Sequence, residues 1–152
     1  MAMGNQLIFT EVQEQIQEYL DDITVPNYLR LETVLLIEDS EDLNNSLSLR
    51  LSQAGYQVVS ALDGLEGLQA IEHHDPDLIL LDIGLPKIGG QKLLHELRGM
   101  PEACKTPVVV ITGLTDPSLE DKLRGFGISR FLRKPIRQKF IVQAVRDVLD
   151  GR

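Results

Sequence analysis

Short apolar runs alternate with amphipathic segments along most of the chain. From Thr33 onward this pattern occurs five times, each time as an apolar run, a loop and an amphipathic stretch. Three of the runs, VLLI, LILL and VVVI, are apolar at every position, which is typical of parallel strands covered by helices on both faces. The pattern therefore predicts a doubly wound α/β fold with an open parallel sheet. The five predicted strands are Thr33–Glu38, Tyr56–Ser60, Asp77–Asp82, Pro107–Thr112 and Ile128–Leu132.

The amphipathic stretches predict five helices, four of them between strands and one at the end of the chain. Gly55 follows the first helix, at the position where a left-handed cap is expected. Pro117 stands at a helix start, where its missing N–H group is harmless. The predicted helices are Glu41–Ala54, Leu65–His74, Gly90–Arg98, Ser118–Phe126 and Ile136–Asp150.

Residues 1–32 precede this pattern and are predicted to form a separate acidic extension, with the main domain covering residues 33–152. The extension carries six acids and one base, a net charge of −5. One amphipathic helix is predicted within it, ended by Pro26. A helix of about 12 residues is marginal alone in water, so its apolar stripe should pack against something. The stripe consists of Val12, Ile16, Tyr19, Leu20 and Ile23.

Composition narrows the class of protein further. The chain has 152 residues and a net charge of −8, which disfavours a nucleic-acid or anionic-membrane surface for the chain as a whole. A single cysteine, Cys104, fits a reducing compartment. Neither a membrane-spanning apolar run nor a secretory signal pattern is present. We therefore expect a soluble cytoplasmic protein that binds neither nucleic acid nor membrane directly.

Polar residues stand where four of the five apolar runs end. Glu38 and Asp39 end the first run, Asp82 the third and Thr112 the fourth, and the fifth leads to Lys134. Ligands of such sheets bind beyond the carboxyl ends of the strands. We therefore expect these five residues to form one site.

The chemistry of this predicted site favours phosphoryl transfer. Three crowded carboxylates repel one another, and a divalent cation relieves the repulsion. Oxygen-only ligands suit Mg²⁺ better than zinc, with Mn²⁺ as an alternative. The ammonium of Lys134 and the hydroxyl of Thr112 can both contact phosphoryl oxygens. A carboxylate nucleophile among these groups, Asp82, is equipped to become an aspartyl phosphate.

Four motifs in order resemble the receiver domain of two-component response regulators. They are IEDS, LLDIGLPKIGG, VVVITG and FLRKP, within a match over about residues 33–150. The resemblance implies a flavodoxin-like sheet of strand order 2-1-3-4-5. It also implies phosphorylation of Asp82 by a sensor histidine kinase or a phosphotransfer protein. Pro86, Gly90 and Pro135 match structural positions of the motifs.

The resemblance also implies roles for individual residues at the site. Mg²⁺ would be held by the side chains of Glu38, Asp39 and Asp82 and by the backbone carbonyl of Gly84. Lys134 would bind the phosphoryl group. The protein would then assist its own phosphorylation and dephosphorylation without being a conventional enzyme.

A conformational switch is the next implication of the resemblance. The hydroxyl of Thr112 would move toward the phosphoryl oxygens and vacate space for the ring of Phe131, while Gly113 leaves room for that ring. The fourth helix, the fifth strand and the fifth helix of the receiver would then rearrange as one surface. A cis peptide is expected between Lys134 and Pro135.

Two positions depart from the common pattern of the family. Gly84 and Leu114 stand where many relatives carry side chains that influence hydrolysis. Neither residue can orient an attacking water by hydrogen bonding. We therefore expect slow self-dephosphorylation.

Three alternative functions can be compared with the response-regulator interpretation. An aspartyl-nucleophile phosphohydrolase needs a second acid two positions after its nucleophile, where this chain has Gly84. A pseudo-receiver that is never phosphorylated is disfavoured because all five site residues are present. A flavin-binding module would need a Ser/Thr-rich phosphate loop after the first strand. The preferred interpretation is a stand-alone response regulator that acts through protein contacts, since no further domain follows Asp150.

One basic stretch suggests a docking surface. Eight bases and no acid lie from Lys122 to Arg146, which is either an ordinary solvated face or a surface for an acidic partner. That partner could be the acidic helix of the same or a second protomer. A homodimer through residues 10–23 or through the Lys122–Arg146 face is therefore one expectation, besides a downstream protein partner.

Overall fold

The computed structural model describes residues 10–19 and 30–151. The chain divides into two units, residues 1–30 and residues 31–152. Residues 10–19 of the first unit are helical, and the side chains of Val12, Ile16 and Tyr19 are exposed on that helix. The rest of the predicted stripe, Leu20 and Ile23, and the predicted stop at Pro26 lie outside the described residues.

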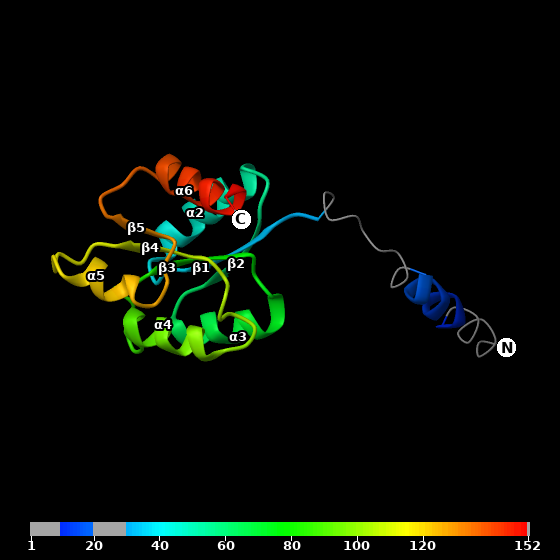
Figure 1. Ribbon diagram of the computed structural model, residues 1–152. Helices are drawn as coiled ribbons and strands as arrows, with labels where there is room; N and C mark the ends of the chain where they lie inside the picture. The colour runs from blue at the N-terminus through cyan, green and yellow to red at the C-terminus, as the bar shows by residue number, and fades with distance from the viewer. Residues whose placement is uncertain (1–9, 20–29, 152) are drawn as a thin grey trace. The chain divides into compact units, whose positions relative to one another are not determined.

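The second unit alternates strands and helices in the predicted order (Figure 1). Its five strands form one parallel sheet of order β2-β1-β3-β4-β5, which confirms the predicted fold class. In chain order the elements are β1 (Thr33–Ile37), α2 (Glu41–Gln53), β2 (Gln57–Ala61), α3 (Gly64–His74), β3 (Leu78–Asp82), α4 (Gly90–Gly99), β4 (Val108–Thr112), α5 (Leu119–Arg124), β5 (Arg130–Arg133) and α6 (Gln138–Asp150).

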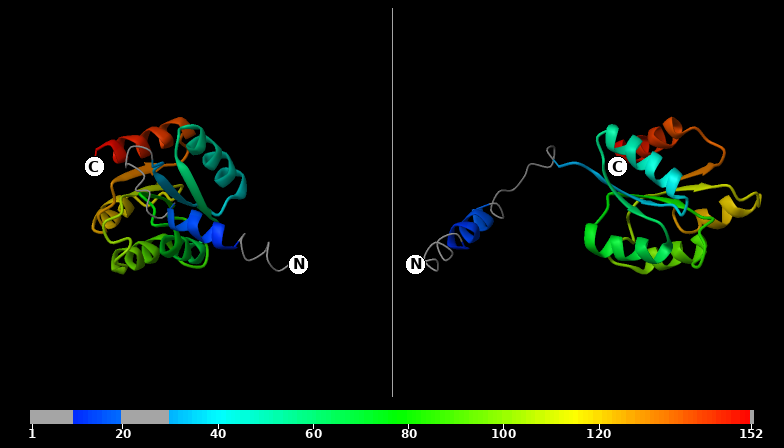
Figure 2. Two further views of the ribbon diagram at one scale, coloured as in Figure 1. Left: turned by 90° about the vertical axis from the view of Figure 1, so that its right-hand side faces the viewer. Right: turned by 180° about the vertical axis from the view of Figure 1, so that it is seen from behind.

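Helices cover both faces of the sheet. Helices α2 and α6 lie on one face, and α3, α4 and α5 lie on the other (Figures 1 and 2). Alternate residues of the central strands supply the two cores: Leu35 and Ile37 of β1 face α3, whereas Val34 and Leu36 face α2 and α6. Successive strand residues point to opposite faces, so a strand buried on both sides is apolar throughout. This is why three of the runs show no alternation.

The predicted fifth strand, Ile128–Leu132, begins two residues before the observed strand β5 (Arg130–Arg133). Strand β5 begins at Arg130 because Gly127, with φ of 70°, turns the chain just before it. Ile128 is buried in the turn, packed with the core beside α5, and is therefore apolar without belonging to the strand. Burial and strand formation coincide in the other apolar runs but not here.

The predicted fourth receiver helix, Ser118–Phe126, was too long. Helix α5 ends at Arg124, because the amides of Phe126 and Gly127 donate to carbonyls only three residues back, in a tight turn. Helix α6 begins at Gln138 and not at Ile136. The other predicted bounds differ by at most one residue, and Gly55 adopts the expected left-handed conformation with φ of 98°.

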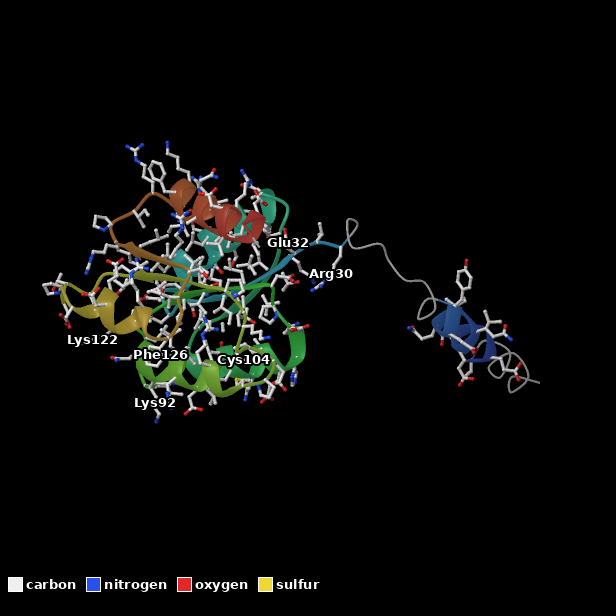
Figure 3. The ribbon with its side chains drawn as sticks, in the orientation of Figure 1. Arg30, Glu32, Lys92, Cys104, Lys122 and Phe126 are labelled. Atoms are coloured by element: carbon white, nitrogen blue, oxygen red, sulfur yellow. The ribbon has the colours of Figure 1, made fainter. Side chains whose placement is uncertain are left out.

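Cys104 lies in the loop that leads into β4, at the edge of the sheet where the strands begin (Figure 3). It is a free, exposed cysteine. No helix within residues 10–19 and 30–151 is both long and apolar enough to cross a bilayer.

Candidate functional site

The carboxyl ends of four strands bring the predicted polar residues to one edge of the sheet. Glu38 follows β1, Asp82 ends β3, Thr112 ends β4 and Lys134 follows β5. The register aligns these ends, since Ile37 pairs with Leu81, Asp82 with Ile111 and Thr112 with Arg133. The structure therefore places these four residues at the same edge of the sheet.

Lys134 joins two of the acidic side chains. Its Nζ atom lies 2.8 Å from Glu38 Oε1 and 3.0 Å from Asp82 Oδ2. Burial disfavours the charge on Lys134, but its hydrogen bonds to the two carboxylates outweigh this cost and raise its pKa above the usual value. Lys134 is therefore a fixed positive charge at the centre of the site.

Glu38 is the least satisfied group of the site. Its side chain is fully buried, and its Oε2 atom has no hydrogen-bond partner within the described part of the chain. Burial, with a hydrogen bond to Asp82, raises the pKa of Glu38 to about 7, although Lys134 acts in the opposite direction. A buried carboxylate oxygen without a partner is costly, and a bound cation would remove that cost.

The acidic side chains fit a metal ion. Glu38, Asp39 and Asp82 each offer one carboxylate oxygen, and these oxygens lie within 4.8 Å of one another. Asp39 is exposed, whereas the other two are buried, so the cluster spans from the core to solvent. An oxygen-only set with one unpartnered buried atom has the chemistry of a site for a hard divalent cation.

Asp82 is held through both of its carboxylate oxygens. The backbone N–H of Gly84 donates to Oδ1 at 2.8 Å, and Lys134 donates to Oδ2 at 3.0 Å. A Cβ atom added at Gly84 would lie 3.4 Å from Asp82 Oδ1, at ordinary contact distance. Side chains at position 84 would therefore stand directly beside Asp82.

Thr112 and the loop after β4 form the next part of the site. Thr112 is fully buried, and its hydroxyl accepts a hydrogen bond from the backbone N–H of Leu114 at 3.0 Å. A Cβ atom added at Gly113 would meet nothing closer than Lys134 Cβ at 4.0 Å. Thr112 therefore has a local partner, and open space surrounds the position after it.

Phe131 lies on β5, on the face of the sheet that α3, α4 and α5 cover. Its half-buried ring packs against that core.

The predicted cis peptide between Lys134 and Pro135 is present. A Cβ atom at Gly90 would lie 2.5 Å from Ile83 Cα, so only glycine fits where α4 approaches the end of β3.

Sequence reasoning missed Asn44, which is buried in α2. Its Nδ2 atom donates to the backbone carbonyls of Glu38 and Ala61, both at 3.1 Å. These bonds fix the chain where β1 and β2 end. A signal was available, because Asn44 stands at helical spacing from Leu47 and Leu51 and is the one polar residue among these three buried positions of α2.

Sequence reasoning also missed Arg133. Its guanidinium donates to the backbone carbonyls of Leu114 at 2.8 Å and Asp116 at 3.3 Å. Its Cζ atom also lies 5.0 Å from the centre of the Phe131 ring. No pattern in the sequence indicates these contacts, because they join the end of β5 to the loop after β4, which only the fold brings together.

The basic stretch Lys122–Arg146 is less positive in space than in sequence. Acids from outside the stretch, or from its flanks, neutralise several of its bases. These pairs are Lys122–Asp116 at 3.3 Å, Arg124–Glu120 at 2.6 Å and Arg130–Asp147 at 3.9 Å. The stretch is therefore not a uniform positive surface, because α5, α6 and the loop before α5 place acids beside its bases.

Comparison with known proteins shows which family and which proteins this chain resembles. Residues 34–146 match the family of response regulator receiver domains. The chain is 34% identical over 118 residues to the DNA-binding dual master transcriptional regulator RpaA of Synechocystis sp., covering 76% of this chain and 48% of RpaA. It is 32% identical over 119 residues to the polar-differentiation response regulator DivK of Brucella ovis, covering 78% of this chain and 96% of DivK.

A solved structure shows the same architecture. The chemotaxis protein CheY4 of Vibrio cholerae matches with a TM-score of 0.74 and 26% identity, covering 78% of this chain and 99% of CheY4. The chain thus spans about half the length of RpaA and nearly all of DivK and CheY4.

Proposed function

The chain belongs to the response regulator receiver domains of two-component systems, and on that premise we propose that Asp82 is its phosphoryl acceptor. The observation that carries this proposal is the position of Asp82, whose carboxylate accepts from the ammonium of Lys134 and lies close to the carboxylates of Glu38 and Asp39. Retention of this constellation favours an active receiver over a pseudo-receiver.

In the proposed reaction, one carboxylate oxygen of Asp82 forms a bond to phosphorus while the bond from phosphorus to the donor breaks. The donor is the phosphohistidine of a sensor kinase or of a phosphotransfer protein. Lys134 is already within hydrogen-bond distance of Asp82, so it can pair with a phosphoryl oxygen as the carboxylate loses its charge. The hydroxyl of Thr112 can donate to another phosphoryl oxygen.

Glu38, Asp39 and Asp82, with the backbone carbonyl of Gly84, would hold Mg²⁺, or Mn²⁺ as an alternative. The unpartnered Oε2 atom of Glu38 and the oxygen-only donor set support this assignment. When bound, the ion supplies positive charge to the transferring phosphoryl group. Asn44 holds the carbonyl of Glu38 and so keeps the acidic pair after β1 in place.

Signalling follows as a shift between two conformations. In the structure the hydroxyl of Thr112 accepts from Leu114, and phosphorylation would draw that hydroxyl toward the new oxygens. The ring of Phe131 would then move inward, toward the space that the Thr112 hydroxyl leaves. We expect the surface formed by α5, β5 and α6 to change with it and to bind a downstream protein.

The same proposal includes where the protein acts and what it binds. The protein acts in the cytoplasm, without direct contact to nucleic acid or membrane. It self-associates through residues 10–23 or through the Lys122–Arg146 face. Deletion of residues 1–30 should then change the oligomeric state or the affinity for a partner in a salt-dependent way. If neither quantity changes, the proposed self-association is wrong.

Acetyl phosphate with Mg²⁺, followed by intact-mass measurement, tests the proposed function. The wild type should gain the mass of one phosphoryl group, and Asp82→Asn should gain none. A wild type that stays unmodified would instead identify a pseudo-receiver. Turnover of acetyl phosphate without any accumulated phosphoprotein would favour a phosphohydrolase.

A further inference from the structure

Arg133 connects two parts of the switch that are separate in the sequence. It is the last residue of β5 and pairs in register with Thr112. Its side chain donates to the carbonyls of Leu114 and Asp116 and lies over the ring of Phe131. One exposed side chain thus contacts both the loop after β4 and the aromatic ring beneath it.

Leu114 links this arginine to Thr112. The backbone N–H of Leu114 donates to the Thr112 hydroxyl at 3.0 Å, while its carbonyl accepts from Arg133 at 2.8 Å. If the Thr112 hydroxyl turns toward a phosphoryl group, the amide of Leu114 must follow it or lose its acceptor. If Leu114 follows, its carbonyl moves relative to Arg133. The two hydrogen bonds therefore oppose a change at Thr112.

We infer that Arg133 is a latch that holds the loop of residues 113–118 and the ring of Phe131 in their unphosphorylated arrangement. This inference rests on the proposed function, because it assumes that Thr112 and Phe131 switch. Arg133 is a positioning residue that acts through Leu114 and Phe131. An arginine suits this role because its planar fork can reach two carbonyls while its face lies on an aromatic ring.

Thermodynamic linkage predicts whether loss of the Arg133 contacts strengthens or weakens binding of a phosphoryl analogue. A ligand that needs the switched conformation binds with an apparent affinity reduced by the fraction of molecules already in that conformation. Loss of the latch raises that fraction. The phosphoryl analogue should therefore bind more tightly to the variant, whereas damage to the site or to the fold would make it bind more weakly or equally well.

Arg130 offers a matched control on the same strand. It is also an exposed arginine of β5, but its ion-pair partner is Asp147 of α6, at 3.9 Å. Arg130→Met and Arg133→Met remove the same charge and donors from the same strand. Only Arg133→Met removes contacts to the loop and to Phe131.

The test measures the Kd of beryllium trifluoride, an analogue of the phosphoryl group, in the presence of Mg²⁺. We expect Arg133→Met to bind about 5- to 10-fold more tightly than the wild type. Arg130→Met should stay within about twofold of the wild type. Equal or weaker binding to Arg133→Met would overturn the latch. Failure of the wild type to bind, or equal binding to Asp82→Asn, would instead overturn the proposed function.

A second measurement needs neither metal nor analogue. The aromatic NMR signals of Phe131, recorded without Mg²⁺, should shift in Arg133→Met toward their positions in the analogue-bound wild type. They should remain unshifted in Arg130→Met, and an unshifted ring in Arg133→Met would contradict the inference. If Arg133→Met does not fold, Arg133→Lys should show smaller changes of the same sign, since lysine lacks the planar fork.

Discussion

The ammonium of Lys134 lies 3.0 Å from Asp82 Oδ2, although the two residues are 52 positions apart in the chain. The same ammonium lies 2.8 Å from Glu38 Oε1. One cation thus serves two buried carboxylates, and the remaining negative charge faces Asp39 and solvent. This charge imbalance supports the proposed binding of a metal ion at the site.

Loss of Lys134 should slow phosphorylation more than it harms the fold. Lys134→Gln removes the positive charge beside the transferring group, and we expect the initial rate with acetyl phosphate to fall about a hundredfold. Initial rates followed by intact mass provide the measurement. Lys139→Gln is the control, because that exposed lysine lies over Phe140 and away from Asp82, and it should keep the wild-type rate. Equal rates for both variants would contradict a role of Lys134 in the transfer.

Glu38 should make stability depend on pH in the absence of metal. Its pKa is about 7 in the folded protein against an ordinary value of 4.5, so the folded state holds its proton more tightly than the unfolded state. The stability from this group is therefore fully present below pH 4.5 and is lost as pH rises to about 7.

Thermal unfolding of the wild type and Glu38→Gln in EDTA between pH 4.5 and 8 measures this effect. The wild type should lose stability relative to the variant as pH rises, and Mg²⁺ should restore the wild type alone. A constant difference in Tm across this range would show that Glu38 does not titrate in it.

Self-dephosphorylation should be slow, with a lifetime of minutes or longer. Neither Gly84 nor Leu114 can orient a water molecule at Asp82. Gly84→Asn should shorten the lifetime, because its side chain would stand beside Asp82 Oδ1 without a clash. Gly89→Asn is the control, since a side chain there enters open space. Loss of phosphoryl mass over time gives the lifetimes, and a wild-type lifetime of seconds would reject the prediction.

Asn44 should support both the fold and the metal site. Asn44→Leu removes a donor to the carbonyls of Glu38 and Ala61, of which only Ala61 keeps a second donor, the backbone N–H of Glu38, and we expect a loss of about 1–2 kcal/mol in the free energy of unfolding. Mg²⁺ affinity should fall as well. Urea unfolding and Mg²⁺ titration test the variant against Asn45→Leu, a neighbouring exposed position that should change neither quantity. Wild-type values for both would show that Asn44 is dispensable.

The sheet and the strand-end residues could be predicted because both depend on local patterns. An apolar run buried on both faces, followed by a polar residue, marks the end of a parallel strand, and the ends of parallel strands meet. Glu38, Asp82 and Thr112 follow this rule. Strand β5 was harder to place because buried Ile128 resembles a strand residue while lying in a turn.

The remaining features depend on contacts that only folding creates. The pKa of Glu38 reflects burial beside Asp82 and Lys134, which are distant in sequence. Arg133 binds carbonyls of a loop, and a carbonyl carries no side-chain signature. Arg130 of β5 meets Asp147 of α6, which lies beyond the basic stretch. Sequence patterns thus locate the proposed acceptor but not the contacts that the fold makes around it.

The identity of the acceptor can be tested most directly by chemical trapping. Borohydride reduces an aspartyl phosphate to homoserine, so protein treated with acetyl phosphate and Mg²⁺ can be reduced, digested and mapped by mass spectrometry. We expect homoserine at position 82 and at no other acidic residue. Homoserine at Asp39, or an unmodified Asp82 in protein that carries phosphate, would contradict it.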